Sequence, residues 1–381
     1  MATTSEAEVA DEVRQWFGQA WDADLPLIEW RGRLVDSGWA VPSWSSDWHG
    51  RDLPAWADRV AHQVIKSEGG VATPLGGGMG LAAPTIYDHG SDDLKRRFLR
   101  PTITGELLWC QLFSEPVAGS DLAGLKTTAV LDGEEWVVNG QKVWNTSAHH
   151  ADMGILVART DWDVTKHAGL SYFLIEMDQP GIEVRPIRQM NDHSSFNEVF
   201  LTDARIPAAN IVGEVGDGWK VARGTLAHER RFGGRSTRTT RPDVSGRAIE
   251  EARAEAAEHE KTYIWYPQRQ GRIDLLRPQA EAKGRSDDPV VRQEMMAVTA
   301  FHRAAELTAE RAKAARELGR PPGSEGSIGK LALSEIARAC TTTHTSIAGA
   351  QGMLRNGPDP EDATVAEVLV STPAQSIAGG T

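Results

Sequence analysis

Two short segments of the sequence combine residue types that suit the binding of a flat, partly polar ligand. The segment FSEPVAGSD, residues 113–121, turns through Gly119 and Ser120, whose small side chains let a ligand approach the backbone N–H donors. The segment NGQKVWNTSA places Trp144 two residues before Thr146, and alternate residues of a strand share a face. An aromatic wall beside a hydroxyl would suit a heteroaromatic ring with one apolar and one polar edge. Taken alone, each piece is more typical of an ordinary turn or of a core tryptophan.

Other common catalytic signatures are missing from the sequence. It contains no G-x-S-x-G elbow, no Walker loop and no strand-associated G-x-G-x-x-G, and the string GEVGDG has the wrong spacing and predicts a domain hinge. Cys110 and Cys340 are the only cysteines, so no disulfide framework and no cysteine-based zinc site is expected. His149, His150 and His228 do not have zinc-ligand spacing. The sequence therefore does not indicate metal or nucleophilic catalysis.

The length, charge and composition of the chain are typical of a globular protein. The chain has 381 residues, 40% of them apolar, and a formal net charge of −12, which disfavours nucleic acid as a partner. The N-terminus lacks the basic and apolar blocks of a signal peptide, so we expect a cytoplasmic protein. The uncharged segment 69–87 is too rich in glycine for a membrane span and predicts a loop over an apolar pocket.

Hydrophobic periodicity divides the chain into helical, β and helical parts. Residues 1–108 show apolar residues at helical spacing, and residues 109–213 alternate apolar and polar residues. Residues 214–381 return to long amphipathic helices whose lengths suit a four-helix bundle, with an irregular insert at about 263–288. The prediction is an α+β protein with a helical domain, a compact antiparallel β domain and a helical bundle.

Local signals refine this division. Ser91 is placed as a helix N-cap, and Pro101 is expected to end the same helix. The pairs Asp132-Gly133 and Asn139-Gly140 each predict a β-hairpin turn.

Three longer strings resemble motifs of the acyl-CoA dehydrogenase family. CQLFSEPVAGSDLAGLKT resembles its flavin-binding strand and loop, VVNGQKVWNTSA its flavin-flanking strand, and FNEVFLTDARIPAANIVGEVGDGW the stretch leading into the C-terminal bundle. The three occur in the family's order, and the resemblance extends along nearly the whole chain. It implies an α-helical domain, a β-barrel-like domain and a four-helix bundle, with FAD between the barrel and the bundle.

The resemblance also implies functional residues. Trp144 and Thr146 would flank the isoalloxazine, with Thr146 reaching toward N5. The remaining positions implied to contact FAD, some of them the FAD of a neighbouring subunit, are Gln111, Phe113, Ser114, Gly119, Ser120, Arg292, Gln293, Gly349 and Thr381. The positions implied for substrate binding are Ser120, Arg230 and Gly379. Shared FAD sites imply a dimer or tetramer.

The family reaction requires a carboxylate that takes the α-proton of an acyl-CoA thioester while the β-hydrogen leaves as hydride to flavin N5. Such a base should be a Glu in a largely dry pocket with a raised pKa. In much of the family this Glu precedes Gly-Thr near the C-terminus, where this chain reads SIAGGT and has Gly379. Other members, of a bacterial type, place it on the first bundle helix before an Arg, and here Glu229 precedes Arg230. The resemblance thus implies Glu229 as the base, against the alternative of a solvated Glu–Arg pair.

The chain departs from the family pattern in several places. Ala227 stands where an Asp often contacts pantetheine, and the R-x-x-F-G motif expected upstream of Gln293 is absent, which fits members that form an α₂β₂ heteromer. The terminal helix that usually follows Gly-Thr is expected to be missing or disordered. A basic patch would contact CoA phosphates or pair with the acidic helix at 249–260; it consists of Arg223, Arg230, Arg231, Arg235, Arg238 and Arg241.

Three hypotheses for the function stay open at this point. The first is an FAD-dependent acyl-CoA dehydrogenase with an electron-transfer flavoprotein as acceptor. The second is a non-catalytic or FAD-sharing subunit of a heteromer, and the third is a flavin monooxygenase or oxidase on the same fold. The acyl group is not fixed by the sequence, although some relatives act on bulky thioesters, including steroid side chains, and the segment 69–87 could accommodate such a group.

Overall fold

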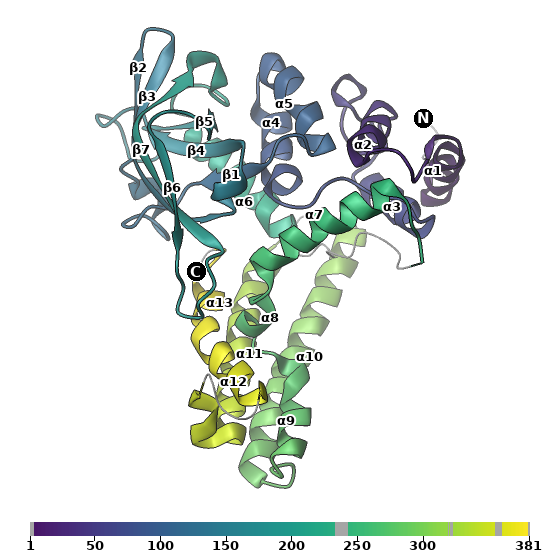
Figure 1. Cartoon of the computed structure of the whole chain (residues 1–381), viewed down its shortest axis with the longest axis vertical. Coiled ribbons are helices and arrows are strands. Elements are labelled where there is room, and N and C mark those ends of the chain that lie inside the picture. Colours follow the sequence, from purple (N-terminus) through teal and green to yellow (C-terminus); the bar gives the residue numbers. More distant parts are fainter. Residues whose placement is uncertain (1–3, 233–242, 319, 321–322, 355–359, 380–381) are drawn as a thin grey trace. The chain divides into compact units, whose positions relative to one another are not determined.

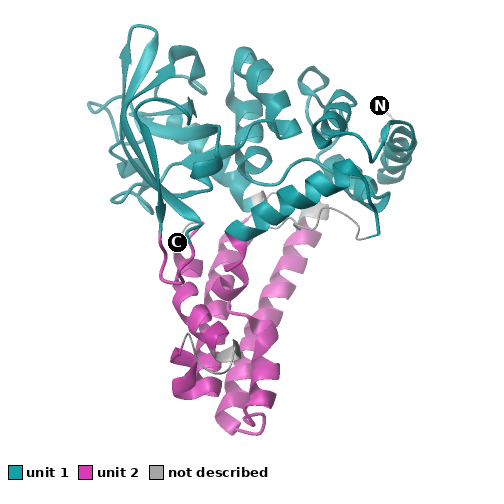
Figure 2. Ribbon diagram, viewed as in Figure 1, with its two compact units in different colours: residues 1–187, 194–262 teal, residues 188–193, 263–381 magenta. Residues whose placement is uncertain are grey.

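The structure, a computed structural model, divides into two compact units (Figure 2). It describes residues 4–232, 243–318, 320, 323–354 and 360–379. Unit 1 consists of residues 1–187 and 194–262, and unit 2 of residues 188–193 and 263–381. Helices α6 (Gly218–Phe232) and α7 (Arg247–Tyr263), which the sequence analysis assigned to the bundle, are grouped with unit 1 apart from the last residue of α7.

Five helices form the N-terminal part of unit 1 (Figure 1). They are α1 (Glu6–Ala20), α2 (Leu27–Asp36), α3 (Trp56–Ser67), α4 (Ala83–His89) and α5 (Asp92–Thr104), with a π-helical turn η2 (Gly78–Ala82) before α4. The predicted N-cap of α5 is confirmed, because the Ser91 hydroxyl accepts from the Leu94 N–H at 3.2 Å.

The prediction that Pro101 ends α5 is wrong. The helix continues to Thr104 and ends at Gly105, whose φ is +89°. A proline costs a helix the bond from its missing N–H, but this loss falls in the last turn. There the Thr102 hydroxyl donates to the Phe98 carbonyl at 2.6 Å, which keeps the turn bonded.

Seven strands form the sheet of unit 1. They are β1 (Trp109–Leu112), β2 (Thr128–Asp132), β3 (Glu135–Thr146), β4 (Met153–Arg159), β5 (Leu170–Glu176), β6 (Ile182–Ile187) and β7 (Phe196–Pro207). Their order is β1-β4-β2-β3-β7-β6, and β5 pairs with β4. The sheet is mostly antiparallel as predicted, but β1 runs parallel to β4.

One of the two predicted hairpins is present. Asp132-Gly133 turns β2 into β3, and Asp132 pairs with Glu135. The prediction for Asn139-Gly140 is wrong, because both residues lie inside the continuous strand β3 at a register shift against β7. A Cβ at Gly140 would lie 2.3 Å from the Thr127 hydroxyl oxygen, so glycine is required here by a close backbone approach and not by a turn.

Strands β4 and β5 are buried on both faces. Met153, Ile155 and Val157 belong to the core shared with the helices, whereas Leu156 and Ala158 face the second core of the sheet. Because both faces are covered, these strands read as continuous apolar runs and form the centre of unit 1.

Helix α7 is fixed to the N-terminal helices by charged groups. The guanidinium of Arg31, which is only 4% exposed, donates to both carboxylate oxygens of Glu255, at 2.7 and 3.0 Å. The Glu251 carboxylate accepts from the Leu27 N–H at the start of α2, at 2.8 Å. These bidentate and capping contacts explain why α7 belongs to unit 1.

Unit 2 is helical in its described part. It contains α8 (Tyr266–Arg269), α9 (Leu276–Ala282), α10 (Pro289–Glu317), α11 (Glu325–Ala348), α12 (Pro360–Ser371) and α13 (Pro373–Ile377). Its core packs Leu276 and Ala280 of the predicted insert against Val291, Val298 and Cys340 of α10 and α11. The insert is therefore part of the core of this unit.

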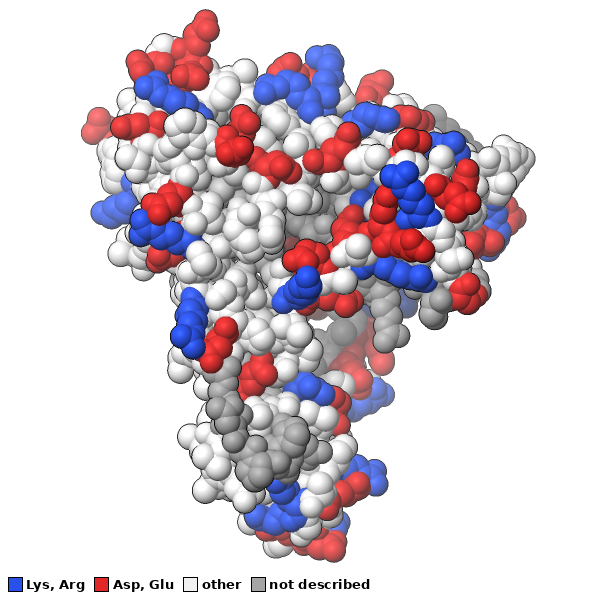
Figure 3. All heavy atoms as spheres, in the orientation of Figure 1, with Lys and Arg blue, Asp and Glu red and all other residues white. Residues whose placement is uncertain are grey.

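The predicted order of N-terminal helices, a middle sheet and C-terminal helices is confirmed. No helix among the described residues combines the length and apolarity needed to cross a membrane. Acidic and basic side chains are interspersed on the face shown in Figure 3.

A buried ion pair joins three segments of the sheet region. Lys142 is fully buried in β3 and donates to the Glu115 carboxylate at 2.9 Å, to the Phe113 carbonyl at 3.0 Å and to the Val157 carbonyl at 2.8 Å. Burial raises the pKa of Glu115, but the Lys142 charge and donated hydrogen bonds outweigh it, so the net pKa is lowered. All three ammonium protons have acceptors, as a buried charge requires.

Loss of the buried ammonium should destabilise the protein strongly. We expect Lys142→Met to reduce the free energy of unfolding by about 3–5 kcal/mol, because Glu115 would stay buried without its counter-charge. Denaturant unfolding followed by circular dichroism measures this change.

The matched control is Arg185→Met, which removes the cation of an exposed pair. Arg185 and Glu183 are 2.7 Å apart, with both side chains more than half exposed. The expected loss is about 0–1 kcal/mol. Equal losses in the two variants would contradict the argument from burial.

Candidate active site

The structure brings together two residues that the sequence analysis assigned to different roles. Gln111 lies in β1 and Glu229 in α6, 118 residues apart, and the Gln111 Nε2 donates to Glu229 Oε2 at 3.4 Å. Both side chains are half-buried. A carboxylate of α6 therefore faces the strand that leads into the segment 113–121.

The surroundings of Glu229 change its protonation. Burial raises the pKa of Glu229 above the ordinary value of a Glu, and the Gln111 hydrogen bond and the Arg230 charge oppose this rise without cancelling it. Arg230 is exposed, and adjacent residues of a helix do not face each other. This geometry is unlike that of a solvated Glu–Arg pair, and a raised pKa makes Glu229 a better proton acceptor than an ordinary Glu.

The segment 113–121 is anchored at its start and open at its end. Phe113 is buried edge-to-face against Tyr172, with ring centroids 5.8 Å apart, and the Ser114 carbonyl accepts from the Val143 N–H at 2.9 Å. Gly119 and Ser120 are exposed, and a Cβ built on Gly119 would meet no heavy atom within 4 Å. A flat ligand could therefore approach the backbone of this turn.

The prediction that Trp144 and Thr146 share a face assumed a regular strand, but Trp144 lies at a bulge. The register of β3 against β7 shifts between Val143 and Asn145, and Trp144 has a φ of +64°. Its side chain is 57% exposed, and its ring stands edge-on to Phe196 at 5.9 Å. A bulky residue in the left-handed region costs on the order of 1–3 kcal/mol and is typical of functional sites. Thr146, two residues on, is half-buried.

Two buried asparagines support this bulge, and the sequence analysis missed them. The Asn145 Nδ2 donates to the Gln111 carbonyl at 2.7 Å, and the Asn197 Nδ2 donates to the Asn145 carbonyl at 2.9 Å. The Oδ1 of Asn145 is buried with no partner among the described residues. The available signal was an Asn inside a strand, where this residue is disfavoured.

These features fit a flavin. An exposed aromatic ring at Trp144, an open turn at Gly119–Ser120 and an unpaired amide oxygen at Asn145 lie in segments joined by hydrogen bonds through Gln111 and Ser114. Flat cofactor sites combine apolar walls with a few placed polar groups in this way.

The predicted site residues of unit 2 that the structure describes lie near helix ends, and Ser346 near the end of α11 donates to Glu294 of α10 at 3.1 Å. Arg292 and Gln293 are exposed in the first turn of α10, and Gly349 follows α11 with a φ of +60°. Gly379 is exposed with a φ of +73°, a conformation in which a Glu would be strained. Thr381 lies outside the described residues.

The predicted basic patch is described only in part. Arg223 and Arg230 are exposed on α6. The side chain of Arg231, and the whole of Arg235, Arg238 and Arg241, lie outside what the structure describes.

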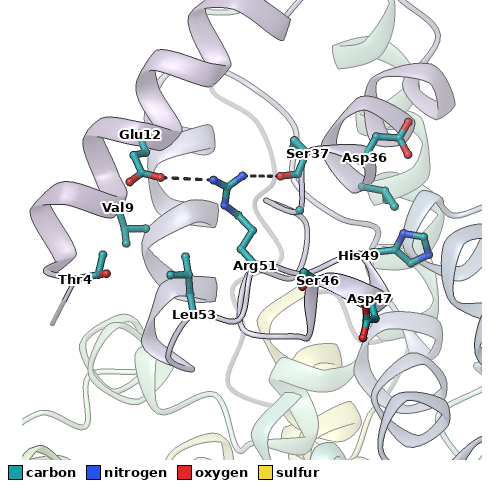
Figure 4. A pocket seen from close by; sticks show the side chains of 13 residues that line it. Thr4, Val9, Glu12, Asp36, Ser37, Ser46, Asp47, His49, Arg51 and Leu53 are labelled. Atoms are coloured by element: carbon teal, nitrogen blue, oxygen red, sulfur yellow. Dashed lines mark hydrogen bonds and ion pairs between the residues drawn. The ribbon is translucent and has the colours of Figure 1, made fainter. Parts of the chain in front are cut away.

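A pocket of about 570 Å³ lies among the N-terminal helices (Figure 4). Its lining includes Glu12, Asp36, His49 and Arg51, and the Arg51 guanidinium reaches the Ser37 carbonyl at 2.8 Å. It shares no lining residue with the Gln111–Glu229 pair. Over the described ranges, no group of three or more His, Cys, Asp or Glu side chains is arranged to hold a metal ion.

Comparison with known proteins gives consistent matches along the chain. Models of the N-terminal, middle and C-terminal domains of acyl-CoA dehydrogenases match residues 1–106, 110–204 and 275–381. The chain is 45% identical over 208 residues to acyl-CoA dehydrogenase FadE34 of Mycobacterium tuberculosis, which covers 55% of this chain and 29% of that protein. It is 39% identical over 251 residues to acyl-CoA dehydrogenase IpdE1 of Mycolicibacterium smegmatis, which covers 58% of this chain and 64% of that protein. The alignments thus span less than two thirds of either relative.

A solved structure shows the same fold. The ChsE4-ChsE5 complex from Mycobacterium tuberculosis superposes with a TM-score of 0.64 at 24% sequence identity, covering 100% of this chain and 95% of the matched one. With domain models matched in the order of the helical, sheet and helical parts, the chain belongs to the acyl-CoA dehydrogenase family, whose members are flavin-dependent.

Proposed function

We propose that this protein is an FAD-dependent acyl-CoA dehydrogenase in which Glu229 is the general base. The observation that carries the proposal is the half-buried Glu229 carboxylate, with its raised pKa, in contact with Gln111 of the predicted flavin-lining segment. A base that works near neutral pH needs this combination of burial and proximity.

The chemistry of Glu229 follows from its surroundings. Its ionised carboxylate takes the α-proton of the thioester and becomes a neutral acid, which a partly dry site favours. FAD, when bound, supplies the acceptor for the β-hydrogen as hydride. Gln111 holds one carboxylate oxygen before the proton arrives, and the exposed Arg230 offers a guanidinium to anionic groups of CoA.

The residues that would hold FAD belong to both units. In unit 1 they are Gln111, Phe113, Ser114, Gly119, Ser120, Trp144 and Thr146. Arg292, Gln293 and Gly349 would contact the FAD of a neighbouring subunit, so the proposal includes a dimer or tetramer, and Thr381 would also contact FAD. An electron-transfer flavoprotein would take the electrons, in the cytoplasm.

A bulky acyl group is the substrate class that we favour. The turn η2 begins at Gly78, follows Gly76 and Gly77, and packs against α6 and β1, the elements of Glu229 and Gln111. A Cβ at Gly77 would lie 3.1 Å from the Trp109 carbonyl oxygen and one at Gly78 3.2 Å from the Thr102 methyl, so these glycines let η2 pack closely beside the proposed site. Gly379, as an exposed N–H, and Ser120 are proposed to contact the thioester part.

One observation favours a second function, that of an FAD-sharing subunit in a heteromer. Gly379 occupies the turn that carries the base in many relatives and offers no carboxylate there. The matched solved structure is itself a complex of two named chains. Protein purified alone would then lack flavin and would gain it on addition of a related partner chain.

Glu229→Gln should abolish turnover while leaving flavin bound. Loss of a general base costs about 10²–10⁴-fold in rate. Anaerobic bleaching of the flavin absorption by a panel of acyl-CoA thioesters measures the rate.

Glu258→Gln is the matched control, because Glu258 is exposed on α7 and pairs with Lys261. It should bleach at the wild-type rate. Full bleaching by Glu229→Gln would exclude Glu229 as the base.

Although Glu229→Gln should lower activity, it should raise the stability of the protein. The pKa of Glu229 is raised by burial, so the folded state holds this proton more tightly than the unfolded state does. Stability is therefore lost as pH rises from the ordinary Glu range through the raised pKa. Glu229→Gln removes this loss, so its thermal midpoint should rise relative to wild type across that window, measured by calorimetry without flavin. A difference that is independent of pH would contradict the raised pKa.

Trp144→Ala should weaken flavin binding. Loss of a stacked aromatic ring should raise the dissociation constant of FAD about tenfold, as measured by fluorescence titration. Trp162→Ala is the control, because Trp162 is also 57% exposed but packs on Arg159. Equal effects of the two substitutions would count against a flavin at Trp144.

A further inference from the structure

Three fully buried hydroxyl groups meet at the buried side of α6, the helix that carries Glu229. Thr85 comes from α4, Tyr172 from β5 and Thr225 from α6, and all three are 0% exposed. The Thr225 Oγ1 lies 2.9 Å from the Thr85 Oγ1 and 3.1 Å from the Tyr172 hydroxyl. We call these three residues the hydroxyl cluster.

The hydrogen bonds of the cluster satisfy its buried hydroxyl groups. The Thr225 hydroxyl lies 3.2 Å from the Val221 carbonyl, which can only accept, so the Thr225 proton is donated there. Its oxygen is also within hydrogen-bond distance of the Thr85 and Tyr172 hydroxyls, each of which can donate or accept. Burial raises the pKa of the Tyr172 phenol, so this group stays a neutral donor. Thr225 is thus the hydroxyl of α6 that contacts both α4 and β5.

Thr225 and Glu229 are linked through the geometry of α6. Residues four apart in a helix lie on the same side, one turn from each other. The rotation that places Thr225 in the cluster therefore also fixes the direction of the Glu229 side chain. His228 adds a contact to α4, with its Nε2 2.9 Å from the Asp88 carboxylate.

The other end of the arrangement is the flavin-lining strand. The Tyr172 ring packs edge-to-face against Phe113, two residues after Gln111 in the chain. Gln111 in turn contacts the Glu229 carboxylate. The hydroxyl cluster and the Glu229 carboxylate therefore both contact the segment 111–113.

We propose that Thr225 is a positioning residue for the base: its buried hydroxyl, held by Thr85 and Tyr172, fixes the rotation of α6 that keeps Glu229 against Gln111. The inference rests on the proposed role of Glu229. A threonine is needed because its hydroxyl bonds to the helix and to two other elements at once, which valine of the same shape cannot do.

Thr225→Val tests this inference without relying on turnover. The pKa of Glu229 can be followed by ¹³C NMR of carboxyl-labelled, flavin-free protein, with Glu229→Gln identifying the signal. Thr225→Val should move this pKa down toward the ordinary Glu value, because the carboxylate leaves its half-buried position. In flavin-loaded protein we expect kcat to fall about 10²-fold with KM within about twofold. Thr225→Ser keeps the hydroxyl and should restore both values.

A matched control separates positioning from stability. Thr372 in unit 2 is also buried, donates to the Val368 carbonyl at 2.7 Å and accepts from the Thr341 hydroxyl at 2.8 Å. Thr372→Val should lower the thermal midpoint without moving the pKa of Glu229. If Thr225→Val also lowered only the midpoint, the positioning role would be refuted.

Two further outcomes are informative. If Thr225→Val does not fold, Tyr172→Phe removes one of the hydroxyl partners of Thr225 and should shift the pKa of Glu229 in the same direction by less; an unchanged pKa in that variant would overturn the proposal. If Thr225→Val shifts the pKa but Glu229→Gln keeps full turnover, the positioning of Glu229 stands and its role as base fails.

Discussion

The buried pair of Lys142 and Glu115 is the interaction on which the site most depends. A lysine with no exposed surface is tolerated only because a carboxylate and two carbonyls accept its three protons. The Phe113 carbonyl lies directly after β1, the Glu115 carboxylate belongs to the turn that follows, and the Val157 carbonyl belongs to β4. Glu115 also accepts from the N–H groups of Lys126 and Thr127. The first part of the segment 113–121 is therefore held by these buried contacts, while Gly119 and Ser120 near its other end are exposed.

This fixed segment allows the strained conformation nearby. Lys142 lies two residues before Trp144, and the bulge that gives Trp144 its positive φ follows at once. After the bulge, the buried Asn145 pairs with Asn197 of β7, and its side chain donates to the Gln111 carbonyl. An exposed tryptophan in the left-handed region is costly, and it persists because the residues on both sides of it are buried and bonded.

The sequence predicted the order of the elements because most of them bury one face, which leaves a visible period of apolar residues. It failed where tertiary contacts decide the backbone. Asn139-Gly140 has the composition of a turn, but its glycine serves a close approach to Thr127. Pro101 is tolerated because a threonine hydroxyl supplies a bond in the last turn of α5.

The candidate site was predicted in part. Gln111 and Glu229 were each identified through a resemblance of motifs, but their contact joins segments 118 residues apart and no local pattern indicates it. The supporting residues were missed for a related reason. Thr225 reads as an ordinary helical residue, and only the meeting of α4, β5 and α6 shows that its hydroxyl has three partners.

The location of Glu229 in unit 1 has a mechanical consequence. Gln111, Trp144 and Glu229 all belong to one compact unit, so the spacing among them is set by internal packing. A carboxylate at the position of Gly379 would instead belong to unit 2. The spacing of these three residues is therefore a property of unit 1 alone.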